Sequence, residues 1–227
     1  MVVLFSKLNG SLENLIARFN IKPKELIMER GYWIRSKPVY TSLVWHEKAT
    51  SHLVVSQGNG GIALLKLFQL KHPKHSINVL YANSANSHAD YAKTLKKVVP
   101  EGLQIINTEQ DVLRVLNNIL PTMCMGLRVY VAGTEAFIWS VSECAKTFGI
   151  EDADIMKELT GTLARSVYCV HCKAITHHIT TNIGQCCGCE RMLFVRDHFS
   201  RRLGAYMGLM VDAESPGEIP EIEEIYP

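Results

Sequence analysis

Four cysteines near the C-terminal end constrain the fold more than any other feature of the sequence. They form two Cys-x2-Cys pairs, and residues 173–185 separate Cys169 and Cys172 from Cys186 and Cys189. Each pair is typical of a tight turn that aims two sulfurs at one point, and two such pairs at this distance fit one tetrahedral metal site. The intervening residues suffice for a β-hairpin that returns the chain. The sequence therefore predicts a closed four-thiolate site whose metal is structural.

Zinc is the metal that we expect at this site. Iron is the alternative, because the same thiolate cage can hold one redox-active iron. Cys187 lies inside the second pair and is predicted to be a spare thiol, since it cannot easily share the metal with both neighbours. His171, His177 and His178 are predicted to be exposed hairpin residues, although mixed Cys/His sites do occur.

Length and composition limit the class of protein. The 227 residues allow one large domain or two small ones, and 47% hydrophobic residues are enough for a core. No apolar run reaches the roughly 18 residues of a membrane span, and the N-terminus has no secretion-signal pattern. Seven cysteines, four of them in metal-binding spacing, indicate a reducing cytoplasm. A net charge of +2 argues against broad nucleic-acid affinity.

Strand and helix patterns alternate in the middle of the chain. Short apolar runs predict strands over residues 52–56, 77–82, 103–107 and 127–132. Helical patterns cover residues 62–70, 89–98, 111–120 and 135–148. The strands are largely apolar, as expected when helices cover both faces of a parallel sheet. The sequence predicts an α/β domain over residues 51–164, with a Rossmann-like sheet of four or five parallel strands.

Three further parts complete the predicted organisation. Residues 1–50 are expected to pack on the α/β domain or on a partner, with a short amphipathic helix within residues 12–19. Residues 165–211 would form the metal ribbon, in which residues 195–210 have mixed helix and strand potential. Residues 212–227 hold six acidic residues, three prolines and no basic residue. Such a tail cannot bury a core and should be extended or disordered when alone.

A glycine-rich turn, Gly58-Asn59-Gly60-Gly61, follows the first predicted strand and opens a helix. This position can present backbone N–H groups and the helix dipole to a phosphate. The turn does not match G-x-G-x-x-G, and a tight connection from strand to helix also needs glycine for backbone reasons. A nucleotide site and a structural turn therefore remain open as interpretations.

Residues 52–150 resemble the NAD-binding half of ferredoxin–NAD(P) reductases. In that family the first strand runs into a glycine-rich pyrophosphate loop, and the last strand ends in a Tyr-Val-Cys-Gly-Pro-like run beside the nicotinamide. Here that run begins at Tyr130, and Ala132 replaces the cysteine before Gly133 and Thr134. The resemblance implies that Gly133 and Thr134 join the glycine-rich turn in a weak candidate NAD(P) site. The replaced cysteine argues against full hydride chemistry.

A basic and aromatic segment follows the cysteines. Arg196, Arg201 and Arg202 alternate there with Phe199 and Tyr206. Such a stripe after a metal ribbon can bind nucleic acid or an acidic protein surface. It can equally form weak ion pairs with acidic residues of the same chain.

The order of these features is similar to that of the zinc-ribbon-bearing subunit of bacterial dimethylamine monooxygenase. The match runs from Ser36-Lys-Pro-Val-Tyr40 over nearly the whole chain and is strongest from Cys169 to Gly208. It implies a subunit of a hetero-oligomer that uses NADPH and oxygen to demethylate dimethylamine to methylamine and formaldehyde. It also implies heme, FMN and an iron-sulfur cluster in partner subunits, because the paired cysteines of this chain are committed to one metal.

Three functional hypotheses follow. The first is an accessory subunit of the monooxygenase, in which a rigid ribbon, the Arg196–Arg202 segment and the acidic tail dock partner subunits. The second is a stand-alone NAD(P)-dependent reductase, whose nucleotide binding would be lost on bulky replacement of Gly60. The third and least expected is a nucleic-acid-binding ribbon with salt-sensitive binding through Arg201 and Arg202.

Overall fold

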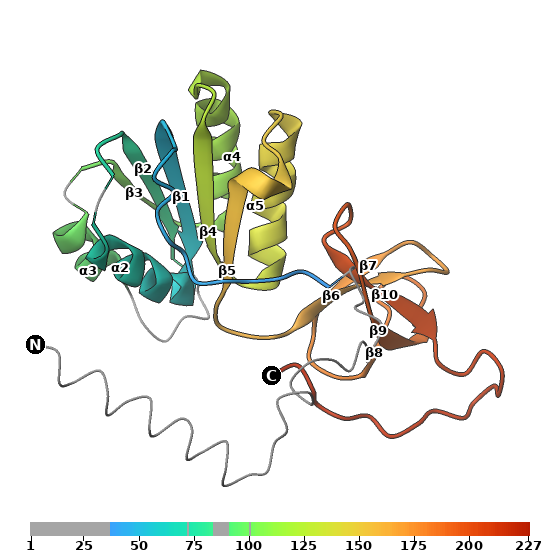
Figure 1. The fold of residues 1–227 in the computed structure, drawn as a ribbon. Helices are drawn as coiled ribbons and strands as arrows, with labels where there is room; N and C mark the ends of the chain where they lie inside the picture. The colour runs from blue at the N-terminus through green and yellow to red at the C-terminus, as the bar shows by residue number, and fades with distance from the viewer. Residues whose placement is uncertain (1–36, 72, 84–90, 100) are drawn as a thin grey trace, which may run out of the picture. The chain divides into compact units, whose positions relative to one another are not determined.

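The computed structural model describes residues 37–227 except 72, 84–90 and 100. The helix predicted within residues 12–19 lies outside this part. Two five-stranded sheets make up the described fold (Figure 1). None of the helices in the described residues combines the length and the apolar character that a membrane crossing requires.

The first sheet is parallel and has the strand order β3-β2-β1-β4-β5. Its strands are β1 (Ser51–Gln57), β2 (Ile77–Ala82), β3 (Leu103–Ile106), β4 (Leu127–Gly133) and β5 (Ile155–Leu159). Its helices are α2 (Gly61–Gln69), α3 (Ala92–Val98), α4 (Glu109–Ile119) and α5 (Glu135–Thr147). Short 3-10 turns are η1 (Gly58–Gly60), η2 (Leu120–Thr122) and η3 (Asp152–Asp154). Because the order reverses between β1 and β4, the sheet is doubly wound, and the predicted Rossmann-like fold is confirmed.

Alternate residues of β1 pack into separate cores on the two faces of this sheet. Val54 belongs to the core formed with α2 and α3. Leu53 and Val55 belong to the core formed with α4 and α5. All three side chains are fully buried, which explains why the strand is apolar without alternation. The two helix pairs lie on opposite faces of the sheet in Figure 1.

Local sequence signals set the ends of α4 and α5. The Thr108 hydroxyl accepts a hydrogen bond from the Asp111 N–H at 3.1 Å, so Thr108 is the N-cap of α4. Thr134 caps α5 in the same way, at 3.4 Å from the N–H of Phe137. Gly149, with a φ of 78°, follows the last turn of α5.

The second sheet has the strand order β7-β6-β10-β9-β8. Its strands are β6 (Arg165–Cys169), β7 (Ile175–Ile179), β8 (Ile183–Gln185), β9 (Met192–Ser200) and β10 (Ala205–Met210). The segment of mixed potential, residues 195–210, therefore supplies strands rather than a helix. Since β10 returns to pair in parallel with β6, the ribbon is a five-stranded sheet rather than a lone hairpin.

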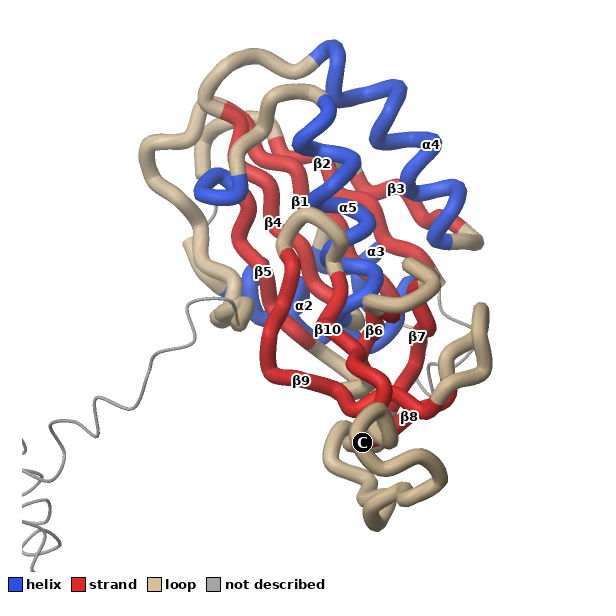
Figure 2. Tube along the Cα trace, turned by 90° about the vertical axis from the view of Figure 1, so that its right-hand side faces the viewer, coloured by secondary structure: helices blue, strands red, loops and turns tan. Residues whose placement is uncertain are grey.

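One hydrophobic core joins the second sheet to α5 of the first (Figure 2). The ring of Trp139 on α5 lies 4.8 Å from the ring of Phe199, which in turn lies 4.9 Å from the ring of Tyr206. Phe199 and Tyr206 are only 3% and 5% exposed. The interpretation of these aromatic residues as part of an exposed binding stripe is therefore wrong, because they face α5. Of the basic residues, Arg201 forms an ion pair with Asp152 at 3.0 Å.

A buried carboxylate lies at this junction. Glu135, the first residue of α5, is 5% exposed and accepts hydrogen bonds from the hydroxyls of Tyr40 at 2.6 Å and Tyr206 at 3.2 Å. Burial raises the pKa of Glu135. Burial and the nearby carboxylate also raise the pKa of both tyrosines, so they remain donors. The network ties the segment before β1 and the second sheet to the same end of α5.

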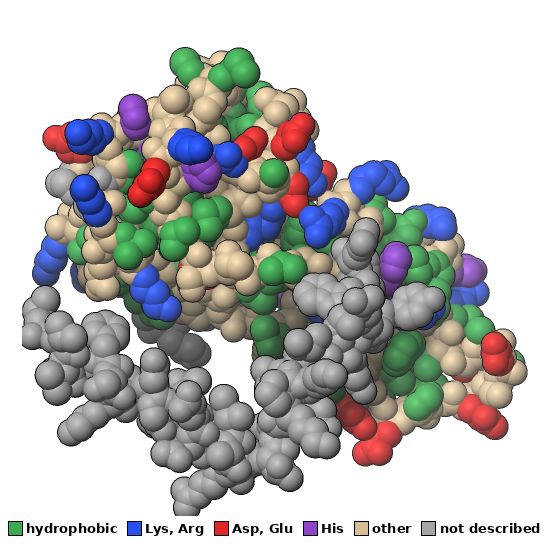
Figure 3. All heavy atoms as spheres, viewed as in Figure 1, with side chains coloured by type: hydrophobic (Ala, Val, Ile, Leu, Met, Phe, Trp, Pro, Cys, Tyr) green, Lys and Arg blue, Asp and Glu red, His purple; other side chains and the backbone are tan. Residues whose placement is uncertain are grey.

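The acidic tail is hydrogen-bonded to the second sheet. The N–H groups of Ile225 and Tyr226 both donate to the carbonyl of Thr180, at 3.0 and 2.8 Å. Glu224 forms an isolated β-bridge with Thr181. In Figure 3, acidic and hydrophobic side chains lie beside one another at the lower right, where the tail of Figure 1 runs.

Candidate functional site

The four predicted cysteine ligands converge in the second sheet, with all four Sγ atoms within 4.8 Å of one another. The Sγ atoms of Cys169 and Cys189 are 3.8 Å apart, and those of Cys172 and Cys186 are 3.5 Å apart. Four sulfurs that surround one ion tetrahedrally at about 2.3 Å lie roughly 3.8 Å from one another. The cage therefore has the size that a zinc or iron ion needs, and the sulfurs are much too far apart for the roughly 2.05 Å bond of a disulfide.

The two Cys-x2-Cys turns have the same backbone structure. In each turn the residue after the second cysteine donates to the carbonyl of the first, at 2.9 Å for Lys173 and 3.0 Å for Glu190. The N–H of the first cysteine also donates at 2.9 Å in both turns, from Cys169 to the carbonyl of Ala174 and from Cys186 to the carbonyl of Arg191. Lys173 and Glu190 also share a positive φ, of 70° and 60°. Local backbone geometry thus aims each sulfur pair at the shared centre.

Glycine at Lys173 or Glu190 should give a more stable protein than alanine at the same position, because glycine adopts a positive φ without strain. A side chain with positive φ costs about 1 kcal/mol or more, so Lys173→Gly should raise the free energy of unfolding by about 1 kcal/mol relative to Lys173→Ala. The alanine variant is the matched control, because it loses the same lysine contacts and retains the strained φ. Denaturant unfolding of the metal-loaded protein measures the difference. Equal stability of the two variants would contradict the role given to the backbone.

Backbone hydrogen bonds favour the thiolate, the form that binds metal, at Cys186 and Cys189, whereas desolvation and hydrogen bonds to the other three sulfurs raise the pKa of Cys172. The backbone N–H of Arg191 is the main cause that lowers the pKa of Cys189 to about 6. The N–H of Gly188 donates to Sγ of Cys186 at 3.4 Å. Cys187 is exposed, and its thiol contacts the carbonyl of Ile175 at 3.5 Å instead of the cage.

The histidines near the cage have other partners. Nδ1 of His171 lies 2.9 Å from the Arg191 guanidinium. Nδ1 of His177 lies 2.9 Å from the hydroxyl of Ser166. Across the described residues, the four cysteines form the one group of three or more potential metal ligands, and it contains no histidine. The donor set is thus composed of sulfur alone.

A cleft of ≈ 910 Å³ lies at the carboxyl ends of β1 and β4. Three of the six residues predicted for a nucleotide site, Gly58, Asn59 and Thr134, line it. The ribbon also contributes His177 and His178 to the lining. Most of the other lining groups are amides and hydroxyls, among them Gln57, Asn83, Asn107, Thr160 and Thr162.

The remaining predicted residues are glycines that packing requires. A Cβ on Gly60 would lie 2.3 Å from the carbonyl oxygen of Ala132. A Cβ on Gly61 would lie 2.5 Å from the side chain of Tyr91, and a Cβ on Gly133 would lie 2.8 Å from the ring of Phe137. These contacts support the interpretation of a structural turn. A bulky residue at Gly60 would disturb the fold and is not a clean test of nucleotide binding.

The electrostatics of the cleft do not suit a pyrophosphate. Among its described lining residues there is no lysine or arginine, and Glu109 adds a carboxylate. Thr108 and Thr134 each occupy one N–H group at the starts of α4 and α5, whereas no side chain caps η1 or α2. Anion sites at helix ends depend on free N–H groups and positive charge. The residues present therefore fit NAD(P) poorly.

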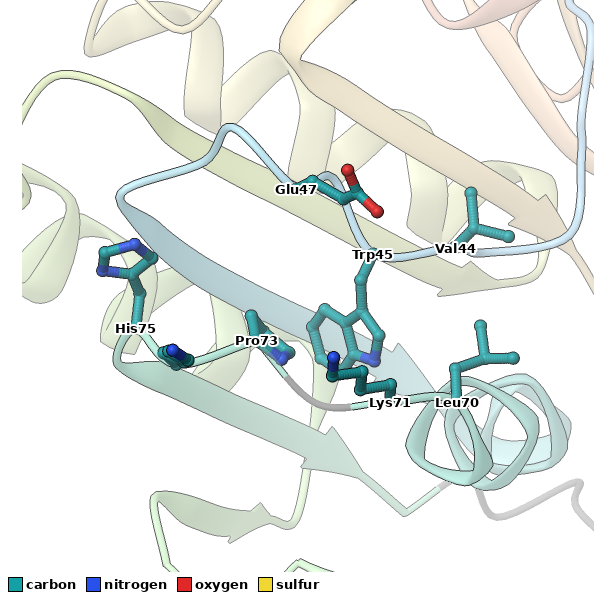
Figure 4. Close-up of a pocket in the computed structure, with 8 residues that line it drawn as sticks. Val44, Trp45, Glu47, Leu70, Lys71, Pro73 and His75 are labelled. Carbon is teal, nitrogen blue, oxygen red and sulfur yellow. The ribbon is translucent and has the colours of Figure 1, made fainter.

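A second hollow, of ≈ 540 Å³, lies beside Trp45 (Figure 4). The indole N–H of Trp45 donates to the carbonyl of Leu67 at 3.0 Å, which fixes the ring as one wall. Val44, Leu70 and Pro73 add apolar surface; the rim residues are Glu47, Lys71, Lys74 and His75. Sequence reasoning missed this hollow, because separate segments contribute its lining.

A doubly wound α/β sheet fused to a four-thiolate ribbon defines the class of this protein. A family model described as "Dimethylamine monooxygenase subunit DmmA-like, N-terminal domain" matches residues 32–155. The corresponding C-terminal domain model matches residues 166–209. The chain belongs to this DmmA-like family, and the resemblance inferred from the sequence is confirmed.

One curated relative is the "Heme-dependent oxidative N-demethylase delta subunit" of Ectopseudomonas mendocina (strain ymp). It is 37% identical over 106 residues. The match covers 47% of this chain and 61% of the relative, which is less than two thirds of its length.

Several solved structures share part of the fold. An intact type IV self-sufficient cytochrome P450 monooxygenase is 18% identical with a TM-score of 0.40, over 59% of this chain and 19% of that chain. A mutant of ferredoxin-NADP+ reductase from Plasmodium falciparum is 14% identical with a TM-score of 0.35, over 49% of this chain and 52% of that chain. Because both TM-scores are below 0.5, the fold assignment depends on strand order and register.

Proposed function

We propose that this chain is a non-catalytic, accessory subunit of a multicomponent monooxygenase that demethylates dimethylamine. Membership of the DmmA-like family and the relative named as a delta subunit support this proposal. The observation that carries it is the closed cage of Cys169, Cys172, Cys186 and Cys189. A metal with four sulfur ligands has no open position for oxygen or an amine, so its contribution would be structural.

The reaction of the whole complex would be (CH3)2NH + O2 + NADPH + H+ → CH3NH2 + HCHO + NADP+ + H2O. Heme, FMN and an iron-sulfur cluster would be held by partner subunits in a cytoplasmic hetero-oligomer, since four cysteines of this chain face one another. Zinc in the cage would fasten the two turns without redox chemistry. Iron in the same cage would instead make this chain a one-electron carrier.

Purification of the native complex through a tag on this chain tests the proposal. The expected result is about one zinc per chain, with heme and flavin in the co-purified subunits. Recovery of the chain without any monooxygenase subunit would reject the accessory role. A red, iron-loaded chain with a reversible redox couple would reject the purely structural metal.

Nucleotide binding is the second candidate, and the position of the cleft favours it. Ligands of doubly wound sheets bind at the point where the strand order reverses, and the cleft lies at the ends of β1 and β4. The described lining argues against nucleotide binding, because it has no lysine or arginine and includes the carboxylate of Glu109. We therefore expect an NADPH titration of the full chain to give no saturable binding below about 1 mM. Saturable binding that Asn59→Trp abolishes and Asn117→Trp leaves unchanged would contradict this expectation. Asn59 lines the cleft, whereas Asn117 is exposed on α4 outside it.

A further inference from the structure

The C-terminal tail is fixed to the second sheet by a series of hydrogen bonds. Asn182 contributes three of them. Its backbone N–H donates to the backbone carbonyl of Glu223 at 3.0 Å, and its side-chain amide donates to the backbone carbonyl of Glu221 at 3.2 Å. Its side-chain oxygen accepts a hydrogen bond from the N–H of Glu223 at 2.9 Å. The N–H of Leu163 donates to the carbonyl of Pro227 at 2.6 Å. The tail backbone therefore has a defined position.

An aromatic and ionic anchor adds to these bonds. The guanidinium of Arg165 lies between the rings of Tyr226 and Tyr206, 3.7 and 3.9 Å from their centroids. It also donates to the hydroxyl of Tyr226 at 2.8 Å and forms an ion pair with Asp197 at 2.8 Å. Tyr226 thus attaches the tail to the sheet through contacts that need none of the tail isoleucines.

Three isoleucines of the tail remain about half exposed, although the anchors hold its backbone. Ile219, Ile222 and Ile225 are 47%, 49% and 43% exposed. They recur at every third residue of a segment whose backbone is hydrogen-bonded to the second sheet, so exposed apolar surface repeats along the tail. An apolar series on an anchored segment is typical of a protein contact, whereas single exposed apolar residues need no explanation.

Acidic side chains accompany the isoleucines. Glu218, Glu221, Glu223 and Glu224 are exposed, and in the described part of the chain none of them belongs to an ion pair. The whole tail has six acidic residues and no basic one. A surface that covers the isoleucines would bring these carboxylates close to its own side chains, so lysine or arginine is required on the partner.

We propose that Ile219, Ile222 and Ile225 form a docking ridge for another subunit of the monooxygenase. Its partner surface is an apolar groove with lysine or arginine along its rim. The apolar side chains supply affinity, and the carboxylates set the register and accelerate association. This inference rests on the proposed function and adds the residues of contact and the chemistry of the partner.

The test measures binding of the full chain to the partner subunits recovered with it from native material. The triple variant Ile219→Ser, Ile222→Ser and Ile225→Ser should weaken binding by roughly 100-fold, because about half of each side chain is still available for burial. Its melting temperature should remain that of the wild type, since the Tyr226 anchor is intact. The matched control replaces three exposed apolar residues that make no tail contact named above, Val39, Ile62 and Met125, with serine and should change binding less than twofold.

Charge and oligomeric state give independent measurements. Replacing the four exposed glutamates with glutamine should flatten the dependence of binding on salt. Unchanged affinity of the triple isoleucine variant would reject the ridge while leaving the proposed function intact. A wild-type chain that binds no monooxygenase subunit would reject both. Self-association that the triple variant abolishes would also reject the inference, because the ridge would then bind a second copy.

Discussion

Replacing Cys186 with serine should release the metal and unfold the second sheet. Cys186 is 1% exposed and belongs to the core shared with α5, with its sulfur 3.5 Å from that of Cys172. Structural zinc contributes about 10–16 kcal/mol in small ribbon peptides, which is comparable to the whole stability of a domain, about 5–15 kcal/mol. The ribbon therefore should not retain its fold once one of four ligands is lost.

The measurement combines metal content with the state of the ribbon. Elemental analysis should fall from about one zinc per chain to none. Tryptophan fluorescence should change as well, because Trp139 packs against Phe199 of the ribbon. Cys187→Ser is the matched control, since that thiol is exposed and points away from the cage. If Cys186→Ser kept a full complement of metal, the four-thiolate site would be wrong.

Phe199→Ala should destabilise the protein by about 3–5 kcal/mol, the usual cost of removing a buried phenylalanine. The ring is 3% exposed and lies between Trp139 and Tyr206, so its loss leaves a cavity where the ribbon meets α5. Denaturant unfolding followed by circular dichroism measures the effect.

Another phenylalanine of the same strand provides the control. Phe194 also belongs to β9 but is 45% exposed, so Phe194→Ala should cost less than about 1 kcal/mol. A Phe199→Ala variant as stable as the wild type, with a defect only in nucleic-acid binding, would instead restore the interpretation of a base-stacking surface.

The features predicted well are those that neighbouring residues specify. A Cys-x2-Cys turn depends on a short stretch of backbone, so two such pairs separated by residues 173–185 were enough to indicate the cysteine cluster. The order of strands and helices followed from hydrophobic periodicity along the chain. The family resemblance depended on the same local motifs.

The features predicted poorly depend on long-range packing. A strand pattern alone cannot say which element covers Phe199, and only the return of β10 to β6 places that ring against α5. The glycines of the turn were open to two interpretations, and only the fold shows that the carbonyl of Ala132 lies where a side chain at Gly60 would be.

The amino-acid sequence by itself determined the order of the α/β elements, the cluster of four cysteines and the family, because each depends on residues close together in the chain. Tertiary structure alone decided that the ribbon shares a core with α5 and that Tyr226 anchors the tail. It also decided that the cleft lining described here has amides and hydroxyls without lysine or arginine. These outcomes depend on contacts such as that between Tyr40 and Glu135, which are 95 positions apart. Such contacts exist only after the sheets have packed and excluded water.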